Sequence, residues 1–83
     1  MCIMLHRMNA RQCRMARDGL GITGRELAAA AGVPYATLAR FEAGANIRED
    51  TLSKVEAALA DLGAQFIYAG ERFGVTVPQQ VKL

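Results

Sequence analysis

The stretch TGRELAAAAGVPYATLARFEA, residues 23–43, contains the strongest structural signals in this chain. Thr23, with Glu26 three residues later, has the spacing of a capping box and predicts that a helix of about eight residues begins there. Gly32 is expected to end this alanine-rich helix, because glycine readily adopts the left-handed conformation that closes helices. The helical period resumes in YATLARFEA and stops at Gly44, so a second helix is expected after a turn of three or four residues.

Two further helices are expected on either side of this stretch. Asn9 and Gln12 also have capping-box spacing, which predicts a helix from about Ala10 to about Asp18. Residues 51–62 carry apolar side chains at helical spacing and end before a glycine, which predicts a fourth helix. The polar residues 46–50 are then a connector between the third and fourth helices.

The periodicity changes after residue 64. QFIYA, residues 65–69, is rich in β-favouring side chains, GERFG is turn-like, and VTV is a second short β run. This pattern predicts a β-hairpin centred on residues 70–74. The expected fold class is therefore mostly α, with four helices followed by a C-terminal β-hairpin. We divide the chain into a tail, residues 1–8, a helical domain, residues 9–63, and a hairpin with a tail, residues 64–83.

The composition of the chain limits the classes of function that it can have. The 83 residues, 52% of them hydrophobic, suffice for one small core, and no apolar run approaches the roughly 20 residues that cross a bilayer. The N-terminal tail lacks the features of a signal peptide, so we expect a cytoplasmic protein without a membrane partner. Cys2, Cys13 and His6 lack zinc-ligand spacing, and no nucleophile has an orienting base; we expect no metal, no cofactor and no catalytic site.

The positive charge is concentrated in the first part of the chain. The net charge is only +2, from ten basic and eight acidic residues. Seven of the ten basic residues are arginines before residue 50: Arg7, Arg11, Arg14, Arg17, Arg25, Arg40 and Arg48. A basic face, if one is present, should therefore lie on the N-terminal part of the fold.

The two central helices are short and joined by a tight turn that contains Gly32. This geometry is that of the DNA-binding helix-turn-helix, in which the second helix presents its N-terminal residues to base edges. An ordinary helical hairpin can contain a glycine in the same place, so the geometry alone leaves both interpretations open.

The residues themselves favour the helix-turn-helix, because residues 23–44 resemble the Cro and lambda-repressor-like family, also called the xenobiotic-response-element (XRE) family. The resemblance rests on Glu26-Leu27-Ala28, Gly32-Val33, Thr37-Leu38 and Glu42-Ala43-Gly44, and it covers about residues 8–63. The hairpin lies outside the shared core. The chain departs from the family pattern at Pro34, where relatives often have Ser or Thr as N-cap, and at Gly24, where a larger polar residue is usual.

The resemblance implies a sequence-specific transcriptional regulator of bacterial or phage type. It is expected to act as a repressor. Its helix of about residues 35–43 would enter the major groove of double-stranded DNA. The implied base-reading residues are Tyr35, Ala36 and Arg40, of which Arg40 could donate two hydrogen bonds to a guanine. The implied phosphate contacts are Thr23, Gly24, Arg25, Thr37, Asn46 and Arg48. The alternatives without a DNA contact are that Tyr35 only covers the turn and that Arg48 is an ordinary solvated side chain.

The resemblance also implies an ion pair between Arg17 and Glu42, which ties the first helix to the end of the third. The alternative is that these are two solvated charges. Leu38 and Phe41, with Ala28 and Val33, would hold the two central helices at their fixed angle.

Assembly is expected to involve the hairpin. A single module of this size reads about four to six base pairs, so such proteins usually act as symmetric dimers on pseudo-palindromic operators. Phe66, Tyr68 and Val75 would form the dimer contact, because two strands alone cannot bury these side chains. Alternatively, the hairpin folds back on the helices of its own chain. A rival function is a protein-interaction module, such as an antitoxin or antiactivator, that binds a protein partner through the hairpin and the apolar tail.

Overall fold

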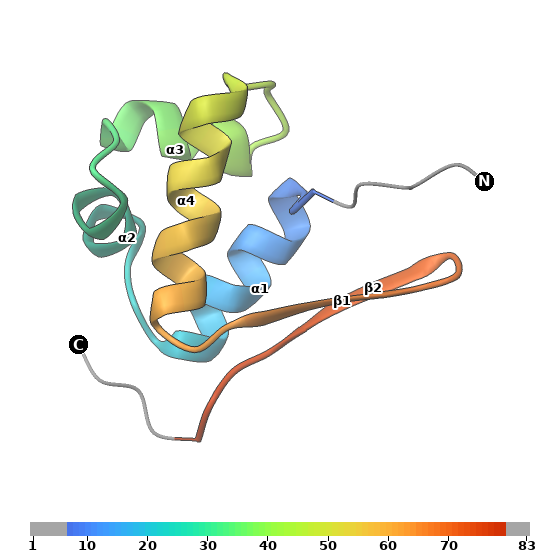
Figure 1. Ribbon diagram of the computed structural model, residues 1–83. Helices are drawn as coiled ribbons and strands as arrows, with labels where there is room; N and C mark the ends of the chain where they lie inside the picture. Colours follow the sequence, from blue (N-terminus) through green and yellow to red (C-terminus); the bar gives the residue numbers. More distant parts are fainter. Residues whose placement is uncertain (1–6, 80–83) are drawn as a thin grey trace.

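Four helices are followed by a two-stranded antiparallel sheet in the computed structural model, which describes residues 7–79 (Figure 1). The elements are α1 (Ala10–Leu20), α2 (Gly24–Ala31), α3 (Tyr35–Glu42), α4 (Glu49–Asp61), β1 (Gln65–Ala69) and β2 (Arg72–Thr76). The predicted fold class is confirmed. The long helix α4 stands in the centre of Figure 1, with α2 on one side, α1 on the other and α3 passing behind its upper part. None of the helices within residues 7–79 is long and apolar enough to cross a membrane.

Both predicted capping boxes are formed. Asn9 accepts a hydrogen bond from the Gln12 backbone N–H at 2.8 Å, and Thr23 accepts one from the Glu26 N–H at 3.1 Å. Gly32 closes α2 at a φ of 71°, in the left-handed region that only glycine adopts without strain. Because these signals act within one helical turn, they place the ends of α2 as the sequence predicts.

Two predicted helix boundaries were wrong. Helix α1 continues to Leu20, two residues beyond the predicted end, and α4 begins at Glu49 rather than Thr51. The early start of α4 has a physical reason: Glu49 and Asp50 stand in its first turn, where the positive end of the helix dipole favours acidic side chains. The predicted connector of residues 46–50 is therefore shorter than expected.

The hairpin turn is also tighter than predicted. Only Gly70 and Glu71 lie between the strands, because Ala69 pairs with Arg72. Gly70 has a φ of 61° while Glu71 has a negative φ, as in the type II′ turn, which places glycine at its first central position. The predicted turn of residues 70–74 was thus too long, and its last three residues belong to β2.

Buried side chains from all four helices form one core. Leu27, Leu38, Val55 and Leu59 are at most 1% exposed, and the predicted inward position of Phe41 is confirmed. Met8 is also buried, although residues 1–8 were predicted as a tail. Residues 1–6, with Cys2 and His6, and residues 80–83 lie outside the described part of the chain.

A partly buried ion-pair network fixes the chain just before α1. Arg7 forms a salt bridge to Glu56 at 2.7 Å and a second one to Glu49. The Met8 backbone N–H donates to the other oxygen of the Glu56 carboxylate at 2.9 Å. Residues 7 and 8 are therefore tied to α4.

The hairpin folds back on its own chain. Pairing of Phe66 with Val75 and of Tyr68 with Phe73 places these four half-buried side chains on one face of the sheet. Phe66 and Val75 pack against the helical core, and β2 lies along α1. Of the two arrangements that the sequence left open, packing of the hairpin on its own helices is the one seen in the single chain, and the dimer contact stays a prediction.

A single buried polar side chain joins α1 to the hairpin. The Gln12 side chain is fully buried, and its Nε2 donates to the Gly74 carbonyl at 3.1 Å while its Oε1 accepts from the Asn9 N–H at 3.2 Å. Burial raises the pKa of Tyr68, and a hydrogen bond with Gln12 acts in the opposite direction. Gln12 thus connects the first turn of α1 with both strands.

The end of α3 is held by α1. Arg17 Nε lies 3.0 Å from Glu42 Oε2, and the Cys13 thiol donates to the same oxygen at 3.3 Å. Arg14 donates to the Glu42 backbone carbonyl. The structure therefore brings Arg17 and Glu42 together. Burial and then Glu42 raise the pKa of Cys13 well above its ordinary value, so the thiol keeps the proton that it donates.

We expect Gln12→Leu to lower the free energy of unfolding by about 1–3 kcal/mol, because it leaves buried hydrogen-bonding groups of Asn9 and Gly74 without a partner. Urea unfolding followed by circular dichroism measures this change. The matched control is Gln65→Leu, at an exposed strand position. Equal stability of the two variants would show that Gln12 does not hold the hairpin.

We expect Glu42→Gln to destabilise the protein by about 1.5–3 kcal/mol, since the neutral amide replaces the charged acceptor of Arg17 and Cys13. The same unfolding measurement tests it, with Glu71→Gln in the exposed hairpin turn as control. A Glu42→Gln protein as stable as the control would mean that the two charges behave as solvated groups.

Candidate nucleic-acid interface

Helix α3 begins without a side-chain cap. Pro34 occupies the N-cap, and its carbonyl accepts hydrogen bonds from the Thr37 and Leu38 N–H groups. The turn is closed by the Val33 N–H, which donates to the Ala28 carbonyl at 3.0 Å. Proline at this position fixes φ and so directs the chain into α3. The departure at Pro34 therefore leaves the start of the helix in place.

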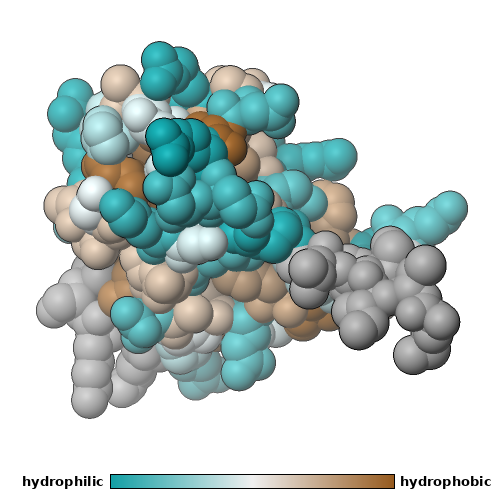
Figure 2. Space-filling view, turned by 45° about the horizontal axis from the view of Figure 1, so that its top comes forward, coloured by the Kyte–Doolittle hydropathy of each residue, from teal (hydrophilic) through white to brown (hydrophobic). Residues whose placement is uncertain are grey.

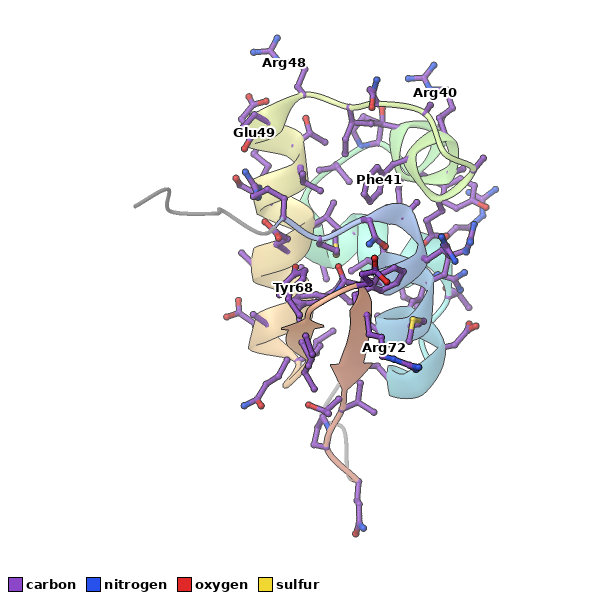
Figure 3. The ribbon with its side chains drawn as sticks, turned by 90° about the vertical axis from the view of Figure 1, so that its right-hand side faces the viewer. Arg40, Phe41, Arg48, Glu49, Tyr68 and Arg72 are labelled. Carbon is purple, nitrogen blue, oxygen red and sulfur yellow. The ribbon has the colours of Figure 1, made fainter. Side chains whose placement is uncertain are left out.

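One side of α3 is buried and the other faces solvent. Leu38 and Phe41 point into the core, whereas Tyr35, Ala36 and Arg40 are exposed. Arg40 projects from the same end of the molecule as Arg48, while Tyr68 lies lower, in the hairpin (Figure 3). Figure 2 brings this end forward and shows mainly hydrophilic side chains across it, with a few apolar patches. This face is exposed and mainly polar, which suits contacts to phosphates and base edges.

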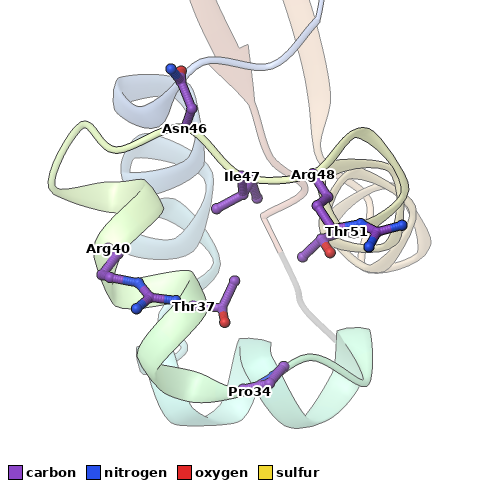
Figure 4. Close-up of a pocket in the computed structure, with 7 residues that line it drawn as sticks. All are labelled: Pro34, Thr37, Arg40, Asn46, Ile47, Arg48 and Thr51. Atoms are coloured by element: carbon purple, nitrogen blue, oxygen red, sulfur yellow. The ribbon is translucent and has the colours of Figure 1, made fainter.

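A groove of about 600 Å³ separates α3 from the start of α4 (Figure 4). Arg40 and Thr37 stand on its α3 side, and Arg48 stands opposite. The full lining is Pro34, Thr37, Arg40, Asn46, Ile47, Arg48 and Thr51. The structure thus brings together four predicted site residues, which are Thr37, Arg40, Asn46 and Arg48.

Sequence reasoning missed two residues of this groove. Ile47 is half-buried and forms part of the lining between the two helices, and Thr51 lies in the first turns of α4. Ile47 could have been found from the sequence, because it is a single apolar residue within the polar connector of residues 46–50. Thr51 was overlooked because the predicted helix began at that residue, whereas the observed helix begins two residues earlier.

The two arginines of the groove differ in their partners. Arg48 forms an exposed ion pair with Asp50 at 3.2 Å, and Asp50 also accepts from the Thr51 N–H at 2.9 Å. Desolvation raises the pKa of Asp50, but the Arg48 charge and the hydrogen bond from the Thr51 N–H act in the opposite direction, and the pKa lies below its ordinary value. Within residues 7–79, Arg40 forms no ion pair. Its guanidinium is therefore available to an external acceptor.

The remaining predicted residues cluster at the start of α2, outside the groove. The Thr23 side chain and N–H are both engaged in the capping box with Glu26. The Arg25 guanidinium lies over the Tyr35 ring, with Cζ 4.4 Å from the ring centroid. Gly24 faces the same ring. The predicted contacts thus form two groups, one on each side of the exposed face of α3.

The described residues offer no metal centre. Among residues 7–79, no three or more His, Cys, Asp or Glu side chains are grouped so that they could hold a metal ion. Cys13 is buried with its proton directed to Glu42. The groove lining combines basic, hydroxyl and amide side chains with Pro34 and Ile47.

Comparison with known proteins agrees with this geometry. A family model described as helix-turn-helix matches residues 14–62, which is more than half of the chain. The match includes α2, the turn, α3 and every residue of the groove. A search among curated proteins finds no significant match. The chain belongs to the DNA-binding helix-turn-helix family of Cro and the lambda repressor, the XRE family.

Proposed function

We propose that this protein is a sequence-specific transcriptional regulator that represses genes by placing α3 in the major groove of an operator. The observation that carries the proposal is the exposed face of α3, on which Arg40 has no ion-pair partner within residues 7–79 and stands across a groove from Arg48. Such a protein would act in the cytoplasm of a bacterium or of a phage-infected cell.

Base reading would fall mainly to Arg40. Its planar guanidinium can donate two hydrogen bonds to the O6 and N7 of a guanine, which is the commonest specific contact in the major groove. Ala36, one turn earlier on the same face, would touch a thymine methyl. Leu38 and Phe41 support this assignment, because their burial fixes which side of α3 faces outward.

Phosphate contacts would come from the two groups that flank α3. The major groove is bordered by a phosphodiester strand on each side and is about 12 Å wide. Thr37, Asn46 and Arg48 would contact one strand from the groove side. Thr23, Gly24 and Arg25 would contact the other from the start of α2. Their separation on either side of the reading helix is what supports the assignment.

We further propose a homodimer formed through the hairpin. Phe66 and Val75 pack against the protein's own helical core, and with Tyr68 they are half-buried, so they would add only part of their surface to a contact with a second copy. The outer face of the hairpin carries Ile67, which is 45% exposed and lies opposite Gly74. Each strand of a two-stranded sheet also keeps one unpaired edge, which can pair with its symmetry mate.

A second candidate function is a protein-interaction module, such as an antitoxin or antiactivator that retains the helix-turn-helix. The exposed apolar side chains of Ile67 and Met15, 45% and 44% exposed, favour it. The two functions differ in their main target. A regulator selects a DNA sequence, whereas an interaction module binds a partner protein more tightly than any duplex.

The test of the proposed regulator uses duplexes that the wild-type protein selects from a random pool, together with a scrambled duplex. We expect Arg40→Ala to weaken binding to the selected duplex by about 1–3 kcal/mol per half-site and to relax preference at one base position. Arg48→Ala is the comparison variant. It should weaken binding to both duplexes alike and reduce the salt slope by about 0.9 for each phosphate that is no longer neutralised.

Two outcomes would contradict these assignments. A wild-type protein that enriches no sequence from the pool would overturn sequence-specific regulation as the function. An Arg40→Ala protein that keeps full preference for the selected duplex would remove Arg40 from the base-reading residues. Thermal unfolding of both variants should match the wild type, because both side chains are exposed.

Sedimentation tests the dimer. We expect the wild-type protein to sediment as a dimer at micromolar concentration and Ile67→Lys to sediment as a monomer, because a buried charge would be added at the contact. Ala57→Lys, on the exposed side of α4, is the control and should stay dimeric. A monomeric wild-type protein would refute the dimer, and a dimeric Ile67→Lys protein would place the contact elsewhere.

A further inference from the structure

The start of α2 and the start of α3 are joined by a stacked pair of side chains. The Arg25 guanidinium carbon lies 4.4 Å from the centroid of the Tyr35 ring. This is well within the distance of about 6 Å at which a cation is attracted to an aromatic face. Both residues are exposed, and Tyr35 is 42% exposed. The pair therefore lies at the protein surface, beside the exposed face of α3.

Gly24 makes room for this arrangement. A Cβ atom at position 24 would stand 3.0 Å from Cε1 of the Tyr35 ring, closer than such atoms normally approach. The φ angle of Gly24 is not in the left-handed region, so its backbone does not call for glycine. The absence of a side chain at position 24 thus leaves room for the Tyr35 ring, and Arg25 lies over the face of that ring.

Stacking leaves the hydrogen-bonding capacity of Arg25 unused. A guanidinium that lies over a ring contacts it with its face, and its five N–H donors point outward in its own plane. The nearest carboxylate in sequence, Glu26, is engaged with the Thr23 N–H. Within residues 7–79, Arg25 forms no ion pair. The stack thus holds a cation at a defined place without neutralising it.

We propose that Tyr35 is a positioning residue for Arg25, which binds a backbone phosphate of the duplex, and that Tyr35 does not itself read a base. This inference rests on the proposed DNA-binding function and gives Tyr35 a different role from the base reading implied by its place at the start of α3. The ring orders the long Arg25 side chain before DNA arrives, so less rotamer entropy is lost on binding. Because phosphates carry no sequence information, the pair contributes to affinity for every duplex.

The salt dependence of binding distinguishes this role from base reading. Each phosphate neutralised by the protein adds about 0.9 to the slope of log affinity against log salt concentration. A base-reading tyrosine is uncharged, so its removal leaves the slope unchanged. A tyrosine that positions Arg25 lowers the slope by up to about 0.9 when it is removed, although the net charge of the protein stays the same.

The experiment is a double-mutant cycle of Tyr35→Ala and Arg25→Ala, measured on a duplex selected by the wild-type protein and on its scrambled counterpart. We expect Tyr35→Ala to weaken binding to both duplexes by about two- to twelve-fold and to lower the salt slope. The double variant should bind no more weakly than Arg25→Ala alone. Tyr35→Phe should bind like the wild type, because it keeps the ring and removes only the hydroxyl.

Arg72→Ala is the control for removal of an exposed arginine, since Arg72 lies in the hairpin, far from the end that carries Arg40 and Arg48 (Figure 3). It should leave the slope unchanged. Additive effects of Tyr35→Ala and Arg25→Ala, an unchanged slope in Tyr35→Ala, or a Tyr35→Phe protein as weak as Tyr35→Ala would each overturn the inference. Absence of salt-dependent duplex binding by the wild-type protein would instead overturn the proposed function, and this inference with it.

Discussion

The position of α3 depends on one residue, Glu42, which three residues of α1 contact. Arg17 and Cys13 donate to its side chain, and Arg14 donates to its backbone carbonyl. The short helix α3 has no side-chain cap at its start, so its place in the fold rests on this end and on its buried apolar side chains. An ion pair with little exposed surface is worth more as a constraint on geometry than as a source of stability, because desolvation offsets most of its attraction.

Helix α1 also fixes the position of the C-terminal hairpin. Gln12, next to Cys13 in the chain, is fully buried and donates to the hairpin carbonyl of Gly74. One helix therefore holds both the exposed helix α3 and the C-terminal hairpin. A contact made by the hairpin would therefore keep a fixed distance and orientation relative to α3. The reason is that α1 contacts both Glu42 of α3 and Gly74 of the hairpin directly, without a flexible loop in between. In a dimer built on the hairpin, the spacing of the two α3 helices would follow from this rigid connection.

The electrostatics of the proposed DNA surface are local. The net charge is only +2, and three arginines are engaged in ion pairs: Arg7 with two glutamates of α4, Arg17 with Glu42, and Arg48 with Asp50. Arg40 and Arg25 form no ion pair within the described residues. If only these two uncompensated arginines face the DNA, binding should have a shallow salt dependence, and a larger share of the affinity would come from shape and direct contacts to bases.

Short-range signals in the sequence were enough to place the N-caps Asn9 and Thr23, and Gly32 in the turn between α2 and α3, because capping and turn signals act over three or four residues. The pairing of Arg17 with Glu42 could also be predicted, but only through resemblance to a family. Docking of the hairpin on α1 became visible only in the folded chain, because it depends on Gln12 meeting a carbonyl 62 residues away. The same holds for the stacking of Arg25 on Tyr35 and for the place of Thr51 in the groove. Such contacts depend on how separate elements pack, and local sequence patterns do not encode packing.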